Sequence, residues 1–64
     1  MDRRLIVLKR DIGRSRSVLR ENGIKVYRLQ ENFDGEFLLG VPPTDFERAQ
    51  QLLTAAGIQV THTS

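Results

Sequence analysis

The sequence predicts one α+β domain in which strands and helices follow one another in the order βαββαβ. The first observation is a repeat. The pattern Leu-x-x-x-Gly-Ile-x-Val occupies residues 19–26 and recurs 34 positions later at residues 53–60. Each copy joins the end of an amphipathic helix, a glycine and the start of a β-branched strand. The second observation is a hairpin signal, Asp34-Gly35, which lies between the two copies.

The first strand is expected over residues 3–9, because the run 5–8 gives it two apolar faces, as in a central strand covered on both sides. Asp11 is placed to cap the helix that follows. The apolar side of this helix consists of Ile12, Ser15, Val18 and Leu19, and Asn22-Gly23 ends it.

The next two strands are expected over residues 24–30 and 36–41, and the turn between them is Asp34-Gly35, whose residues both tolerate positive φ. Pro42-Pro43 ends the third strand, because proline cannot donate a hydrogen bond to a neighbouring strand.

A second helix follows, and its start matches a capping box in which Thr44 accepts from a backbone amide and Glu47 reaches back. Gly57 ends this helix. Residues 58–61 then form the fourth strand by their alternation of apolar and polar side chains.

Two βαβ units joined by a hairpin define a ferredoxin-like sandwich, a four-stranded antiparallel sheet with two helices on one face and the first and third strands in the centre. Alternation assigns to the helix-covered face Ile6, Leu8, Ile24, Val26, Phe37, Leu39, Val41, Ile58 and Val60. It leaves on the open face Leu5, Val7, Tyr27, Leu29 and Leu38. Such an apolar face needs a cover: the sheet of a second copy, a partner protein or an apolar ligand. The alternative is the opposite assignment of the strand faces.

Sixty-four residues make a single domain, 1–64, with a marginal core. The chain has no cysteine and one histidine, His62, so a disulfide framework and a thiolate or imidazole metal cluster are excluded, and no cofactor is predicted. Oligomerisation is the remaining source of stability.

No apolar run is long enough to span a membrane and no signal peptide is expected, so we expect a cytoplasmic protein.

Positive charge is concentrated in residues 1–28, whose net charge is +6, whereas residues 29–64 carry −4. This asymmetry fits an anion-binding or nucleic-acid-binding side, the pairing of basic and acidic halves of two molecules, or simply a solvated surface. Nucleic-acid binding on the sheet has little support, because Tyr27 is the single aromatic residue on the open face.

The turn between the first strand and the first helix is the strongest candidate for a small-ligand site. Free amides at the start of a helix bind carboxylates and phosphates, and Gly13 would let a ligand approach the backbone. The candidate ligand-binding residues are Asp11, Ile12, Gly13, Arg14 and Arg10. The alternative is that Asp11 satisfies these amides and Gly13 serves only a tight turn.

The chain resembles the ACT regulatory domain. The resemblance is carried by an Asp-x-Gly turn into the first helix, residues 35–41, and the helix end Ala56-Gly57-Ile58-x-Val60. It differs in Ile12, where the family often has proline, and in a shorter first helix. The resemblance implies the ferredoxin-like fold, pairing through the sheet, and an amino acid or similar small effector at the turn of residues 11–14.

We therefore expect a free-standing, non-catalytic binding or regulatory module, because no nucleophile has a base beside it in sequence. Its expected partners are a second copy bound through the sheet and an amino acid or small anion. The alternative is a protein–protein interaction modulator that meets an acidic partner through the open face or the arginine-rich first helix. Nucleic acid is a weaker alternative.

Overall fold

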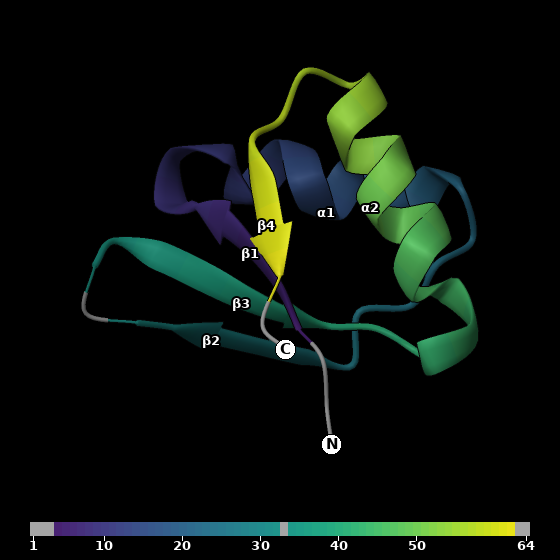
Figure 1. Ribbon diagram of the computed structural model, residues 1–64, viewed down its shortest axis with the longest axis horizontal. Helices are drawn as coiled ribbons and strands as arrows, with labels where there is room; N and C mark the ends of the chain where they lie inside the picture. Colours follow the sequence, from purple (N-terminus) through teal and green to yellow (C-terminus); the bar gives the residue numbers. More distant parts are fainter. Residues whose placement is uncertain (1–3, 33, 63–64) are drawn as a thin grey trace.

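The computed structural model describes residues 4–32 and 34–62, in which two helices accompany a four-stranded antiparallel sheet (Figure 1). The elements are β1 (Leu5–Leu8), η1 (Lys9–Asp11), α1 (Ile12–Glu21), β2 (Arg28–Glu31), β3 (Glu36–Gly40), η2 (Pro43–Asp45), α2 (Phe46–Ala55) and β4 (Val60–His62). The predicted α+β class is confirmed, and the arrangement is compatible with a ferredoxin-like fold. Residue 3, at which the sequence predicts the first strand to begin, lies outside the described residues. No helix in the described part of the chain is long and apolar enough to cross a membrane.

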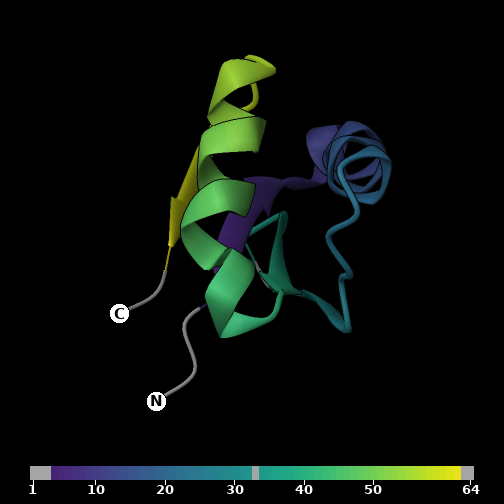
Figure 2. The same ribbon diagram turned by 90° about the vertical axis from the view of Figure 1, so that its right-hand side faces the viewer.

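The strands are ordered β2-β3-β1-β4 across the sheet, so β1 and β3 are central. In the register of β1 with β3, Leu5 lies opposite Leu39 and Ile6 opposite Leu38. In the register of β1 with β4, Leu5 lies opposite His62. The two helices cross instead of lying side by side. α1 runs across the view of Figure 1 and is seen end-on in Figure 2, whereas α2 stands upright in both.

Both copies of the repeated pattern form the same helix ending. In the first, the amide of Gly23 donates to Arg20 O (3.0 Å) and the amide of Ile24 to Leu19 O (2.9 Å). In the second, the equivalent bonds run from residue 57 to 54 and from 58 to 53, at 3.0 Å each. These are the two bonds of a Schellman motif, in which the glycine takes positive φ. The φ angles are +74° at residue 23 and +79° at residue 57. The leucine and isoleucine of each copy belong to the buried core.

The strand that the sequence predicts over residues 24–30 begins later, at Arg28. Ile24 is buried, but it acts as the apolar anchor of the helix ending, and its amide bonds Leu19 instead of a neighbouring strand. The fourth strand likewise begins at Val60 rather than at residue 58. In the hairpin, the backbone amide of Asn32 donates to Glu36 O at 2.9 Å. Among the described residues of this hairpin loop, Gly35 alone has positive φ (+75°).

The predicted face assignment of the first strand is wrong. Leu5 and Val7 are 0% and 1% exposed and pack in the core with Leu39, instead of lying on the open face. Ile6 and Leu8 are half-buried on the other face. Alternation could not decide between the two faces because both faces of residues 5–8 are apolar.

We call the face opposite the core the Ile6 face. By register it holds Ile6, Leu8, Glu36, Leu38, Gly40, Gln30, Arg28 and Thr61. Leu38 therefore lies on this face, as predicted. Leu29 pairs with Leu39 on the core side of the sheet, yet it is 41% exposed at the β2 edge. Tyr27 is 57% exposed.

The predicted capping bonds are absent from both helix starts. Each α-helix is preceded by a 3₁₀ turn, whose carbonyl accepts the first helical amide: Ile12 N–H donates to Lys9 O, and Phe46 N–H to Pro43 O. Asp11 occupies the cap position of α1 without a side-chain cap bond. Thr44 lies inside the turn before α2, so the capping box does not form.

Candidate functional site

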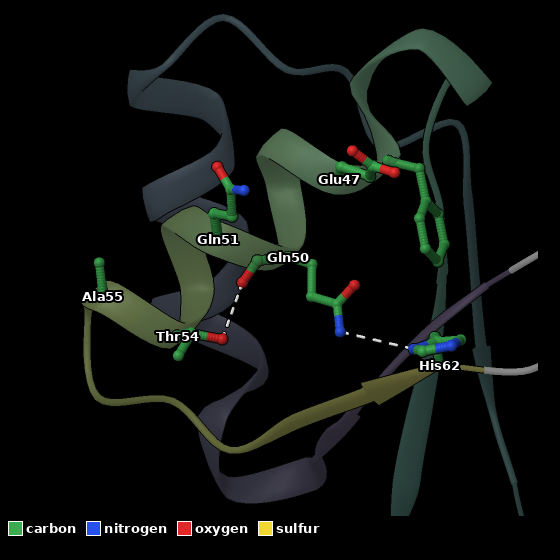
Figure 3. Close-up of a pocket in the computed structure, with 7 residues that line it drawn as sticks. Glu47, Gln50, Gln51, Thr54, Ala55 and His62 are labelled. Carbon is green, nitrogen blue, oxygen red and sulfur yellow. Dashed lines mark hydrogen bonds between the residues drawn. The ribbon is translucent and has the colours of Figure 1, made fainter.

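A groove runs between the exposed side of α2 and the end of β4 (Figure 3). Its volume is about 640 Å³. Pockets for small molecules typically enclose roughly 300–1,000 Å³. We call it the α2–β4 groove. Its lining consists of Phe46, Glu47, Gln50, Gln51, Thr54, Ala55 and His62.

The helical repeat explains why one side of α2 is polar here. Glu47, Gln50, Gln51 and Thr54 are spaced i, i+3, i+4 and i+7, so they share one side of the helix. Core residues such as Leu53 occupy the other side. The groove is therefore a polar helix stripe set against the edge strand β4.

His62 closes the groove from the strand side. Its ring meets the ring of Phe46 edge-on, with centroids 5.9 Å apart and planes at 87°. Its Nδ1 lies 3.4 Å from Nε2 of Gln50, whose side chain points toward it in Figure 3. Phe46 is 3% exposed, and with Ala55 it supplies the apolar part of a lining that is otherwise made of polar side chains.

The chemistry of the groove suits hydrogen bonding to a ligand. Gln50 and Gln51 offer carboxamides and Glu47 a carboxylate, whereas the hydroxyl of Thr54 is already used, donating to Gln50 O at 2.9 Å. Within residues 4–32 and 34–62, no three His, Cys, Asp or Glu side chains are grouped so as to hold a metal ion. The groove is not predicted from the sequence, although the spacing of the polar residues on α2 can be read from it. Its position depends on packing against His62, far along the chain.

The structure places the predicted ligand-binding residues around one turn but gives them separate surroundings. Arg14 Nη2 donates to Ala56 O at 2.7 Å, so this guanidinium binds the end of α2. Ile12 packs against the core. Arg10 Nε lies 4.0 Å from Asp11 Oδ2, a loose pair between an exposed guanidinium and a carboxylate whose side chain is only 16% exposed.

Gly13 borders open space. No atom lies within 4 Å of the position that a Cβ would take there, and its φ is not positive. The glycine is therefore not required by the backbone conformation, and the turn leaves room beside it.

The Ile6 face combines an apolar centre with charges at its two ends. Ile6 and Leu38 form the centre, Glu36 lies beside Leu8 at one end, and Arg28 lies opposite Gly40 at the other. A Cβ at residue 40 would lie 2.9 Å from Arg28 Cβ and 3.3 Å from Tyr27 Cε2. The ring of Tyr27 therefore packs against this glycine and extends the face at its basic end.

Comparison of the chain with models of protein families, with curated proteins and with solved structures found no match.

Proposed function

We propose that the chain is a ferredoxin-like, non-catalytic binding module with both helices on one face of its sheet, and that two copies pair through the Ile6 face. The observation that carries this proposal is the charge pattern of that face, which is complementary to itself. Pairing would also supply the stability that a small core lacks.

The complementarity follows from the register. Glu36 and Arg28 lie at opposite ends of the apolar centre made by Ile6 and Leu38. A two-fold axis that lies between two stacked sheets and crosses the strands reverses the strand direction of one copy relative to the other. Glu36 of each copy then lies over Arg28 of its partner, so both ion pairs form at once.

The resemblance to ACT domains adds a ligand to this proposal, an amino acid or similar small anion at the turn of residues 10–14. The open space beside Gly13 favours close approach to the backbone. Arg10 supplies the charge there, because Arg14 is engaged with α2. A thermal-shift panel of amino acids tests this part: a raised melting temperature that Arg10→Gln reduces supports it, and the absence of any shift contradicts it.

Oligomeric state tests the pairing directly. Sedimentation should give twice the chain mass of 7.3 kDa. Leu38→Glu should give a folded monomer, because it places charge at the centre of the paired faces. Gln51→Glu, an exposed change on α2, is the matched control and should leave the dimer intact.

Charge reversal tests the two-fold arrangement. Arg28→Glu alone and Glu36→Arg alone should each weaken pairing, because each sets like charges opposite one another. A mixture of the two variants should form the dimer again, since each basic end then meets an acidic one. A monomeric wild-type chain, or a Leu38→Glu dimer as tight as the wild type, would overturn the proposed pairing.

A further inference from the structure

A second hollow lies between α1 and the segment that follows it, residues 24–26. Its lining is basic, unlike that of the α2–β4 groove. It encloses about 250 Å³ and is lined by Arg16, Arg20, Ile24, Lys25 and Val26. We call it the basic hollow. Figure 2 shows α1 and the segment that follows it on the opposite side of the molecule from β4.

Three cationic side chains gather in the basic hollow. Arg16 and Arg20 are four residues apart, so they lie on one side of α1, separated by about 6 Å along its axis. Lys25 reaches the same space because the Schellman turn at Gly23 brings the chain back along the helix. The structure gives none of the three an ion pair within residues 4–32 and 34–62.

Repulsion among these three cationic side chains destabilises the fold unless an anion binds between them. Like charges at i and i+4 on a helix destabilise it by a few tenths of a kcal/mol. The negative end of the helix dipole favours Arg20 in the last turn. It does not account for Arg16, which lies in the middle of α1 and is exposed.

The kind of anion follows from the side chains and the volume. Two guanidinium groups present forks of N–H donors that match the oxygens of a phosphate. The volume is below the roughly 300–1,000 Å³ of pockets that enclose drug-sized ligands. The hollow therefore has room for a phosphate group, with Ile24 and Val26 as an apolar border for the atoms next to it.

We propose that the basic hollow binds a phosphate group, held by Arg16, Arg20 and Lys25. The phosphate comes either from a free polyphosphate or from a nucleic-acid backbone, and the two sources share the chemistry recognised here. The site lies on α1 and the following segment, and none of its lining residues belongs to the Ile6 face, so the proposed binding does not depend on the proposed pairing.

The test uses the full chain and two probes, inorganic pyrophosphate and a fluorescently labelled single-stranded RNA. Amide chemical shifts should change with pyrophosphate at residues 16, 20 and 24–26. Arg16→Gln and Arg20→Gln should each weaken binding of the probe by about tenfold, the effect of losing a charged hydrogen bond. Arg48→Gln removes the same charge from α2 and should change binding by less than about twofold.

Comparison of the two probes distinguishes a free polyphosphate from a nucleic-acid backbone as the source of the phosphate. Binding of pyrophosphate without RNA identifies a free polyphosphate as the ligand, and salt-sensitive RNA binding tighter than that of pyrophosphate identifies a nucleic-acid backbone. The proposal is overturned if neither probe binds at low salt, if a polyglutamate peptide binds as tightly, or if Arg48→Gln weakens binding as much as Arg16→Gln. Circular dichroism of each variant verifies that it is folded, and sedimentation reports separately on the pairing through the Ile6 face.

Discussion

The two glycines that end the helices allow the geometry of the repeated pattern to be tested one atom at a time. Gly23 and Gly57 have φ of +74° and +79°, and a Cβ at either position would meet no other atom within 4 Å. Alanine there would be unfavourable for its backbone conformation alone, which costs about 1–2 kcal/mol for an L-residue. Since a change of 1 kcal/mol shifts the melting temperature of a domain of this size by roughly 4–8 °C, each substitution is measurable.

Urea denaturation followed by far-ultraviolet circular dichroism measures the loss. We expect Gly23→Ala and Gly57→Ala to lower the free energy of unfolding by similar amounts, because the two endings have the same bonds. Gly13→Ala is the matched control. It also places a methyl group in open space, but φ is not positive and the residue is helical, so it should raise stability by up to about 1 kcal/mol.

A synthetic chain with D-alanine at residue 23 distinguishes the backbone cost of positive φ from steric contacts of the added methyl group. D-Alanine prefers positive φ and restricts the unfolded chain, so it should raise stability by about 0.4–1 kcal/mol where L-alanine lowers it. Equal effects of the two enantiomers would refute the argument, because a purely conformational cost must depend on chirality.

Three further substitutions test other parts of the structure by the same denaturation assay. Gly40→Ala should destabilise the chain by about 1–3 kcal/mol, since its Cβ would lie 2.9 Å from Arg28 Cβ; a neutral effect would contradict this contact. Leu5→Ala should cost about 2–5 kcal/mol and Ile6→Ala clearly less, and the reverse order would restore the face assignment expected from the sequence. Arg14→Gln should cost up to about 1 kcal/mol, because an exposed bond to the end of α2 is lost; salt should reduce the difference, and a salt-independent loss would point to packing instead.

The repeated pattern made the helix ends predictable because a Schellman motif is local. Leucine, glycine and isoleucine at fixed spacing contain all of its parts, so residues 19–24 and 53–58 specify both endings without the rest of the chain. The hairpin at Gly35 was predictable for the same reason.

The sequence could not show which side chains of β1 enter the core, because residues 5–8 are apolar throughout. The answer depends on which residues of the neighbouring strands they pair with. Pairing of Leu5 with Leu39 is set by the register of two strands about thirty residues apart in sequence. The capping prediction failed at Thr44 because the 3₁₀ turn supplies a backbone carbonyl for the first amide of α2. The α2–β4 groove was not predicted because it forms only when His62 of β4 packs beside the polar side of α2.

The place of β1 in the sheet has a consequence for folding kinetics. It is the first strand of the described residues, yet its neighbours are β3 and β4, and β4 is the last strand described. Contacts between distant parts of a chain close slowly, because loop entropy is lost before pairing energy is gained. Until β4 has paired with β1, one edge of this central strand has no partner, and another copy's strand can pair with it. We therefore expect the pairing of β4 with β1 to be a late step in folding, and slow pairing of β4 should favour exchange of that strand between copies.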